Sequence, residues 1–253
     1  MMKTRVMPCL LLNEGGLVKT VKFKDPSYVG DPINAVKIFN TKEVDELVVL
    51  DIGATSEGRA PDFDAIQDIV SEAFMPVAYG GGITTADQAQ TLFALGIEKV
   101  VLNSAVAATP GLVSELAERF GSQSVVVAVD AKRRGLFSKL EAMTHNAKQK
   151  TGQDPASFAR EMERLGAGEI FLNAVDRDGT QTGFDVELIG QVANAVDVPL
   201  VACGGAGNVT DFKAAIGAGA SAVAAGSLFV YHGPHRAVLI SYPDRRELED
   251  LLP

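Results

Sequence analysis

The stretch PVAYGGG at residues 76–82 returns 123 residues later as PLVACGG at residues 199–205. In both copies an apolar run ends in adjacent glycines, which is the pattern of a buried strand followed by a tight turn. Other pairs keep the same spacing: Gly96 with Gly219, Asn103-Ser104 with Gly226-Ser227, and Glu46 with Glu169. A repeat of this length has room for four β/α pairs, so two copies predict one closed barrel with approximate two-fold symmetry.

Short apolar runs alternate with amphipathic stretches along the chain, as in a parallel sheet whose strands are joined by helices. The expected strands are Arg5–Leu10, Glu46–Asp51, Pro76–Tyr79, Lys99–Asn103, Val125–Asp130, Glu169–Asn173, Pro199–Cys203 and Ala222–Ala225. The expected helices are Pro32–Phe39, Phe63–Ala73, Thr85–Leu95, Pro110–Phe120, Pro155–Leu165, Val186–Ala195 and Asp211–Ile216. This alternation predicts a single (β/α)8 TIM barrel with a half-barrel repeat, and a length of 253 residues suits one such domain over residues 1–253.

Three helix starts carry a recognisable signal. Asp31-Pro32, Thr109-Pro110 and Asp154-Pro155 each place a capping residue directly before a proline. Proline is favoured in the first helical turn, where its missing N–H has no partner to lose. We therefore expect Asp31, Thr109 and Asp154 to be N-caps.

Composition and charge exclude several classes of protein. The net charge is −9, which argues against nucleic-acid binding because phosphate backbones attract a basic face. The first residues form no signal peptide, and the sequence has no apolar run of about 18 residues that could cross a membrane. We expect a cytoplasmic protein that binds neither nucleic acid nor membrane.

The cysteines and histidines give no sign of a metal site. Cys9 and Cys203 lie in apolar runs and are expected to pack in the core or at strand ends. The three histidines, His145, His232 and His235, lack the spacing of metal ligands within a helix. The sequence therefore predicts no metal and no cofactor.

One segment interrupts the alternation of strands and helices. Residues 132–151 follow the fifth expected strand and carry six of the chain's lysines and arginines together with His145. A solvated loop or small hairpin is one interpretation, and an active-site flap is the other. Loops after barrel strands lie on the catalytic face, which favours the flap.

Each half of the chain carries a candidate phosphate grip. The first consists of Gly81, Gly82, Asn103 and Ser104; the second consists of Gly204, Gly205, Gly226 and Ser227. Glycines let backbone N–H groups approach an anion, and a following helix adds its dipole. Asp178-Gly179-Thr180 can add backbone donors and a hydroxyl to the second grip, although a simple Asp-Gly turn is the alternative. Two grips at one barrel mouth predict a bisphosphate ligand.

Polar side chains are expected where several strands end. Asp51, Asn103, Asp130 and Asn173 close the second, fourth, fifth and sixth strands, where barrel enzymes hold their reactive groups. A carboxylate at such a position meets a ligand instead of the core. Asp130 is therefore the best candidate for a general acid or base.

These motifs resemble the cyclase subunit (HisF-type) of imidazole glycerol phosphate synthase. The resemblance runs from about Lys3 to Phe229 and is carried by Pro8–Leu10, Val49–Asp51, Ser56–Arg59, Tyr79–Ile83, Phe120–Gln123, Val127–Arg133, Thr144-His145, Gly166–Ile170, Asp176–Thr180 and Gly204–Gly207. It implies a heterodimer with a HisH-like glutaminase, whose ammonia crosses the barrel and reacts with a phosphorylated ligand at the far face. It also implies that two catalytic aspartates end strands one and five.

The resemblance is incomplete at the implied catalytic pair. Asp130 matches the second aspartate, whereas the position of the first is Leu11, in the run Leu10–Asn13. Leucine transfers no proton, so acid–base catalysis by two carboxylates is lost in its usual form. Asn173 stands where the family usually has threonine.

The opposite end of the barrel keeps the family pattern. The resemblance implies a gate for ammonia made of two basic and two acidic residues at strand starts. The matching residues are Arg5, Glu46, Lys99 and Glu169, all of the expected charge. Alternating charges at these positions can form a closed salt-bridged ring around the barrel axis.

A retained gate with an altered outlet resembles a divergent branch, the glycosyl amidation-associated (WbuZ-type) proteins. The likeness is marked in Leu10–Leu12, Gly16–Phe23, Gly30–Asn40 and Gly226–Pro243. It implies delivery of ammonia to a sugar amidotransferase that converts an acetamido sugar for a surface polysaccharide such as lipopolysaccharide. Residues Tyr231–Pro243 are either a closing helix with a surface segment or a docking surface for that amidotransferase.

Three functional hypotheses follow. The first is an ammonia-conducting subunit that serves sugar amidation. The second is a true cyclase of histidine biosynthesis, a lyase that converts ammonia and PRFAR into imidazole glycerol phosphate and AICAR. The third is a non-catalytic scaffold that activates the glutaminase without passing ammonia.

Overall fold

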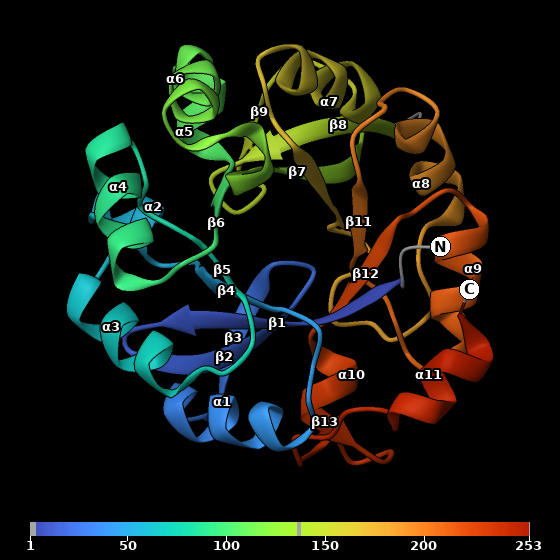
Figure 1. Ribbon diagram of the computed structural model, residues 1–253. Helices are drawn as coiled ribbons and strands as arrows, with labels where there is room; N and C mark the ends of the chain where they lie inside the picture. Colours follow the sequence, from blue (N-terminus) through green and yellow to red (C-terminus); the bar gives the residue numbers. More distant parts are fainter. Residues whose placement is uncertain (1–3, 136–137, 253) are drawn as a thin grey trace.

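A closed ring of parallel strands forms the centre of the molecule (Figure 1). The computed structural model describes residues 4–135 and 138–252. The barrel strands are β1 (Arg5–Asn13), β4 (Leu47–Asp51), β5 (Val77–Gly80), β6 (Lys99–Leu102), β7 (Val125–Arg134), β10 (Glu169–Ala174), β11 (Leu200–Cys203) and β12 (Ala222–Ala225). They follow one another in chain order, and β12 pairs with β1 to close the ring. The fold is the predicted (β/α)8 TIM barrel.

The half-barrel repeat is visible in the element bounds. Strands β5 and β11 occupy equivalent positions in the two halves, as do β6 and β12, each pair 123 residues apart. Gly81 and Gly82 after β5 have φ values of 124° and 72°, and Gly204 and Gly205 after β11 have 91° and 112°. These left-handed turns favour glycine, which explains why both copies of the repeat end in a glycine pair.

Helices cover the outside of the barrel (Figure 1). The long ones are α1 (Pro32–Thr41), α3 (Phe63–Glu72), α4 (Ala86–Leu95), α6 (Gly111–Phe120), α7 (Pro155–Arg164), α8 (Val186–Ala193), α9 (Thr210–Gly217) and α11 (Arg245–Leu251). Shorter turns are α2 (Ala54–Glu57), α5 (Ser104–Ala108), the 3-10 turn Ser122–Ser124 and α10 (Ser227–Val230). All seven of the expected helices match observed ones within a few residues.

Two of the three predicted caps are confirmed. Asp31 accepts a hydrogen bond from Asn34 N, and Asp154 accepts one from Ser157 N. The prediction for Thr109 is wrong. Its own N–H donates to Ala105 O at 2.7 Å and ends helix α5, so α6 begins only after Pro110 and has no side-chain cap.

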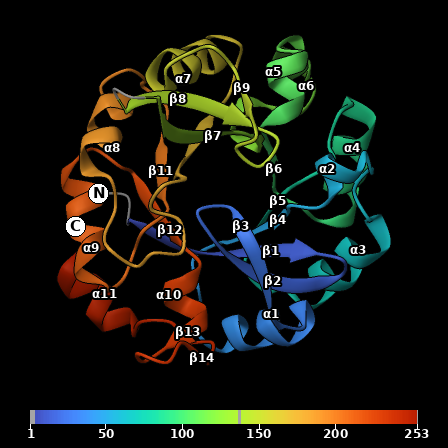
Figure 2. The same cartoon turned by 180° about the vertical axis from the view of Figure 1, so that it is seen from behind.

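A hairpin that the sequence analysis missed extends over one opening of the barrel (Figure 2). Strand β1 continues past Leu10 to Asn13 and pairs with β2 (Gly16–Val21), which pairs with β3 (Lys24–Gly30). Lys22 and Phe23 form its tip, both with positive φ, at 55° and 60°. Such a two-residue turn matches the right-handed twist of the flanking strands.

The polar segment at residues 132–151 forms a second hairpin. Strand β7 runs on to Arg134 and pairs antiparallel with β8 (Lys139–Thr144), which pairs with β9 (Gln149–Lys150). Residues 136–137 of this segment lie outside the described residues. The small-hairpin interpretation is confirmed, and the same hairpin lies at the barrel mouth described below.

The predicted closing helix does not fall within Tyr231–Pro243. These residues form a short hairpin of β13 (Tyr231–His232) and β14 (Ala237–Val238), and the last helix begins at Arg245. The turn between the two strands contains Gly233 at φ 70° and Pro234, neither of which favours a helix. Asp244 then caps α11.

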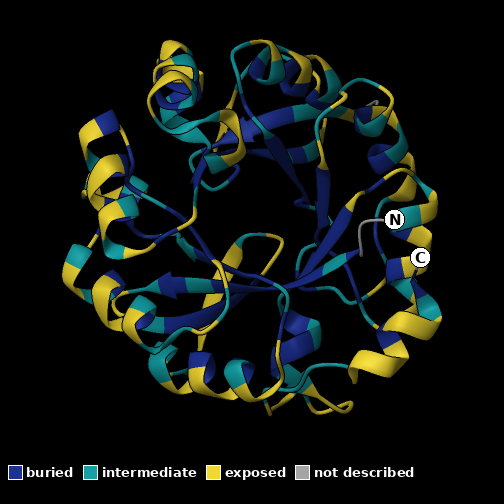
Figure 3. Cartoon of the chain, viewed as in Figure 1, coloured by how far each residue is buried: buried dark blue, intermediate teal, exposed yellow. Residues whose placement is uncertain are grey.

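Most of the apolar core belongs to two clusters, one inside the barrel and one between barrel and helices, and the strands that separate them are largely buried (Figure 3). Side chains alternate along each strand, so on β1 Val6 and Leu10 pack outward while Met7 and Cys9 pack inward. Cys9 and Cys203 are free and buried in the inner cluster, as predicted. Among the described residues, no helix combines the length and apolar character needed to cross a membrane.

Replacing the N-cap of α7 tests the importance of helix capping. We expect Asp154→Ala to lower the free energy of unfolding by about 1 kcal/mol, because Ser157 N loses its acceptor. Hydrogen bonds from Ser157 lower the pKa of Asp154. The contribution is therefore fully present above the unfolded pKa of about 3.9 and is lost as the pH falls through the folded pKa.

Urea unfolding at pH 7 and at about pH 3 measures this difference. Asp68→Ala is the matched control, because Asp68 is exposed within α3 and caps no helix. We expect the control to change stability by less than about 0.5 kcal/mol. An Asp154→Ala effect equal to the control at pH 7 contradicts the prediction.

Candidate functional site

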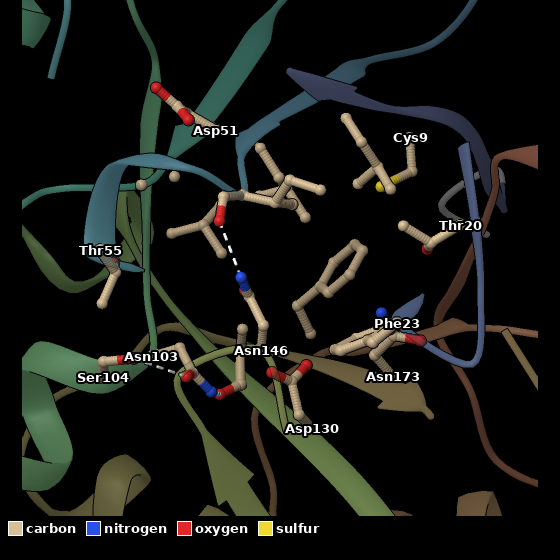
Figure 4. A pocket seen from close by; sticks show the side chains of 18 of the residues that line it. Cys9, Thr20, Phe23, Asp51, Thr55, Asn103, Ser104, Asp130, Asn146 and Asn173 are labelled. Carbon is tan, nitrogen blue, oxygen red and sulfur yellow. Dashed lines mark hydrogen bonds between the residues drawn. The ribbon is translucent and has the colours of Figure 1, made fainter. Parts of the chain in front are cut away.

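The carboxyl ends of the strands surround a cavity of about 310 Å³. Its walls come from both halves of the barrel and from the β2–β3 and β8–β9 hairpins (Figure 4). Among the predicted site residues it brings together Leu11, Asp51, Gly81, Gly82, Asn103, Ser104, Asp130, Asn173, Asp178, Gly226 and Ser227. This cavity lies where TIM barrels hold their active sites.

Asp130 lies on β7 directly opposite Asn173 of the neighbouring strand β10. Figure 4 shows the two side chains next to each other at the cavity wall. Burial raises the pKa of Asp130 to about 7, and the nearby carboxylate of Asp178 acts in the same direction. A carboxyl group with this pKa exchanges its proton near neutral pH, which suits a general acid or base.

Leu11 on β1 lines the same cavity. Its alkyl side chain stands at the position where the family resemblance implies the other catalytic carboxylate. Leu11 pairs in register with Leu50 of β4 and with Val18 of β2. Both Leu11 and Leu50 pack against the inner apolar cluster. On this side the mouth is therefore lined by alkyl groups, and proton transfer rests on other residues.

The first predicted phosphate grip is assembled at the cavity. A side chain on Gly81 would approach Asp51 O to 2.4 Å, and one on Gly82 would approach Arg59 O to 2.6 Å, so both turns require glycine. Ser104 Oγ donates to Asn103 Oδ1 and accepts a bond from His145 N. Because Asn103 Nδ2 donates to Ala128 O and Met143 O, its amide orders the wall.

The second grip is tighter and only partly as predicted. Gly204, Gly205, Gly226, Ser227, Asp178 and Gly179 surround an adjoining cavity of about 20 Å³. Thr180 contributes no hydroxyl there, because its Oγ1 donates to Arg177 O at 2.7 Å within its own turn. Asp178 does not face a ligand alone either, since its Oδ2 accepts bonds from Thr20 Oγ1 at 2.8 Å and Phe23 N at 3.3 Å.

Those bonds fasten the β2–β3 hairpin over the mouth and bring in a residue that the sequence analysis missed. Lys19 is 5% exposed and lines the cavity, where its Nζ donates to Cys9 O at 2.6 Å. Burial lowers the pKa of Lys19, although nearby Cys9 and Asp178 oppose the shift. The β-branched residues Val18, Thr20 and Val21 in Gly16–Val21 were the signal that could have revealed this strand.

The β8–β9 hairpin also contributes to the cavity. Asn146 and Lys148 line it, and Asn146 Nδ2 donates to Ile52 O across the mouth. Asp51 is less available than predicted, because its Oδ1 accepts bonds from Gly53 N and Ala54 N and its Oδ2 pairs with Arg59 at 3.4 Å. The segment after β7 thus combines a hairpin with contact to the candidate site.

At the opposite end of the barrel, four charged side chains form a closed ring. The Arg5 guanidinium donates to both Glu46 and Glu169. Lys99 Nζ lies 3.0 Å from Glu46 and 2.9 Å from Glu169. Each acid thus bonds to both bases, as the sequence predicted for a ring, and both acidic side chains are only 6% exposed.

The ring and the mouth lie on one axis. Along β1 the inward positions are Arg5, Met7, Cys9 and Leu11, and along β10 they are Glu169, Phe171 and Asn173. The inner cluster between them is apolar, with small side chains such as Ala128 and Ala224 among its members. The barrel interior is thus charged at one end, apolar in the middle and polar at the other.

No metal site emerges from the geometry in the ranges 4–135 and 138–252, where no group of three or more His, Cys, Asp or Glu side chains could hold an ion.

Comparisons with known proteins agree with this arrangement. Residues 5–235 match the model of the family described as histidine biosynthesis protein. The chain is 50% identical to hisF2 of Pseudomonas aeruginosa over 98% of its length and 99% of that protein, whose name marks its assignment to imidazole glycerol phosphate synthase as provisional. It is 42% identical to imidazole glycerol phosphate synthase subunit HisF of Pyrobaculum aerophilum over 97% of both chains.

Breaking the charged ring should destabilise the fold more than breaking an exposed pair. Arg5→Met leaves two nearly buried carboxylates with Lys99 as their remaining ring partner, so we expect the free energy of unfolding to fall by about 2–3 kcal/mol. Lys37→Met is the control, because Lys37 and Glu72 pair at 3.3 Å with side chains 53% and 41% exposed. We expect that loss to be about 0.5 kcal/mol or less in urea unfolding. Equal losses in the two variants would show that the ring is no stronger than a surface pair.

Proposed function

Because this chain belongs to the family of HisF-type imidazole glycerol phosphate synthase subunits, we propose that it receives ammonia from a HisH-like glutaminase and conducts it through the barrel for the amidation of an acetamido sugar. The observation that carries the proposal is the combination of a closed charged ring at one end with Leu11 at the other. The ring matches what an ammonia gate requires. Leu11 occupies the position of one of the two carboxylates that the cyclase reaction uses.

The interior between ring and mouth suits a small neutral molecule. The stem, as we call the barrel interior between ring and mouth, is lined by Met7, Val48, Val126 and Phe171. These inward-facing residues are 1% to 2% exposed, so the stem is dry and apolar. Moving neutral ammonia from water into the stem costs less free energy than moving ammonium, because burying a charge costs far more than burying a dipole. The stem therefore favours passage of the neutral form, and the four charges at the ring must separate to admit it.

The glutaminase fits best at the end of the barrel that carries the ring. Ring residues Arg5, Glu46, Lys99 and Glu169 lie at or next to the starts of their strands, on the face opposite the mouth. Phe74, two residues before Pro76 in the loop that leads into β5, is 87% exposed on that side. An exposed aromatic next to a charged ring is the composition expected of a protein–protein contact.

The amidotransferase fits best at the tail hairpin. Arg236 lies 4.4 Å over the ring of Tyr231 and donates to Gly179 O at 3.2 Å, which fixes the hairpin beside the second grip. Val238 and Leu239 on the same hairpin are 51% and 55% exposed. This apolar strip beside the mouth supports the docking interpretation of Tyr231–Pro243, with the complex acting in the cytoplasm.

Reconstitution with the glutaminase and amidotransferase tests conduction directly. Ala128 faces inward below Asp130 and is 8% exposed, so Ala128→Phe places a ring in the stem. We expect glutamine-dependent amidination to fall about tenfold or more, while added ammonium chloride still supports the wild-type rate, because free ammonia reaches the mouth from solution.

Ala214→Phe serves as the control, since Ala214 is exposed on α9 outside the barrel. It should leave both rates unchanged. If Ala128→Phe keeps full glutamine-dependent activity, ammonia does not travel along the axis and the scaffold hypothesis is favoured.

The second candidate function, the cyclase reaction of histidine biosynthesis, is favoured by Asp130, whose pKa is about 7, and by the first phosphate grip. A single proton-transfer carboxylate is insufficient for the two-carboxylate mechanism. We therefore expect the wild-type chain, paired with a glutaminase, not to complement a histidine auxotroph.

Restoring the carboxylate makes that expectation quantitative. Leu11→Asp should raise cyclase turnover at least about 100-fold over the wild-type chain, because a positioned acid–base group typically contributes that much. Leu50→Asp is the matched control, since Leu50 pairs with Leu11 and lines the same cavity. Complementation by the wild-type protein would establish the cyclase function and remove sugar amidation as the first choice.

A further inference from the structure

The amide of Asn173 is exceptional among the buried polar groups. Its side chain is 7% exposed, and within the described residues its Oδ1 is buried without a hydrogen-bond partner. Such an oxygen has lost its hydrogen bonds to water without gaining one from the protein, which is rare in folded proteins. Asn173 lines the mouth cavity, so a ligand in that cavity can supply the missing donor.

The oxygen is free to turn toward the cavity. It now lies 2.8 Å from where a Cβ on Gly204 would be, under the turn that follows β11. The terminal torsion of asparagine is broad, so the amide can rotate. Because Oδ1 makes no hydrogen bond in its present position, rotation breaks none of its contacts of that kind.

The residue paired with Asn173 on the neighbouring strand carries a second acceptor, a carboxyl group. Asp130 is the register partner of Asn173, and both face inward one layer above Ala128 and Phe171. Burial and, after it, the nearby Asp178 raise the pKa of Asp130. Rotation of the Asn173 amide therefore brings a second hydrogen-bond acceptor to the side of Asp130, where the apolar stem ends.

Three other charged groups of the cavity already have partners. Lys19 donates to Cys9 O, Asp178 accepts from Thr20 and Phe23, and Asp51 pairs with Arg59. Lys148 and the thiols of Cys9 and Cys203 complete the titratable groups of the cavity wall. Asn173 and Asp130 therefore offer acceptor oxygens, and a small ligand that carries only N–H donors can bond to both.

We propose that Asn173 and Asp130 form a binding site for ammonia, which is held there as ammonium at the outlet of the stem. The inference rests on the proposed function for the source of the ammonia, whereas the site itself belongs to the barrel alone. Ammonia arriving from the stem takes the proton of the Asp130 carboxyl, giving ammonium and a carboxylate. One N–H then bonds to the carboxylate and another to Asn173 Oδ1, and returning the proton to Asp130 releases neutral ammonia.

Binding can be measured on the isolated barrel by carbon-13 NMR of labelled aspartate carboxyl groups. Asp130 is titrated in ammonium chloride, in potassium chloride and in tetramethylammonium chloride at equal ionic strength, and its signal is assigned with Asp130→Asn. We expect ammonium to lower the pKa of Asp130, raising its acid dissociation constant about tenfold. Potassium and tetramethylammonium, which carry no N–H, should not do so.

Asn173→Leu removes the amide oxygen at nearly constant volume and should reduce the ammonium effect to about threefold or less. Thr55→Val is the matched control, since Thr55 lines the α2 side of the same cavity, and it should keep the full effect. The proposal is overturned if ammonium and potassium give the same titration of wild-type Asp130, a comparison that does not depend on the folding of any variant. It is also overturned if Asn173→Leu responds as strongly as the wild type.

The result separates this inference from the proposed function. An ammonium-specific shift together with failed sugar amidination would refute the acceptor while leaving the site in place. Successful amidination without any ammonium-specific shift would refute the site alone.

Discussion

The strict alternation of side chains in a closed parallel sheet is the constraint on which the rest of this structure depends. A residue at one strand start fixes which positions of that strand face the axis, and register carries the choice to the neighbouring strands. Arg5 and Leu11 therefore share a face of β1, as Glu169 and Asn173 share a face of β10. Ring, stem and mouth are consequences of one geometric rule, and none can shift by one residue without turning the core outward.

The two ends of this axis are under different physical demands. At the ring, the two carboxylates are nearly buried, so each needs cationic partners, and Arg5 and Lys99 supply them. At the mouth, a leucine replaces the carboxylate that the family resemblance implies, while Asp130 keeps a pKa near 7 through burial. The pairing of charges at the ring is complete, whereas the mouth holds only one of the two strand-end carboxylates that the resemblance implies.

The hairpins decide how closed the mouth is. Asp178, which the sequence placed among phosphate ligands, also holds the β2–β3 hairpin through Thr20 and Phe23. Burial raises the pKa of Asp178, although the bonds from Thr20 and Phe23 and the nearby Lys19 oppose the shift. The tail hairpin joins this region through Arg236, which donates to Gly179 O beside the second grip.

The sequence by itself determined the barrel, its repeat, the faces of its strands and the membership of the charged ring. The barrel, its repeat and the strand faces depend on local periodicity and on turns that need glycine, both of which are encoded in neighbouring residues, whereas the ring residues were identified through the resemblance to the HisF-type family. Only the tertiary structure decided that Thr180 bonds within its own turn, that Lys19 is buried, and that Asn173 Oδ1 is buried without a partner among the described residues. Contacts such as Thr20 with Asp178 join residues 158 positions apart, and their formation depends on how whole hairpins pack, which no local pattern encodes.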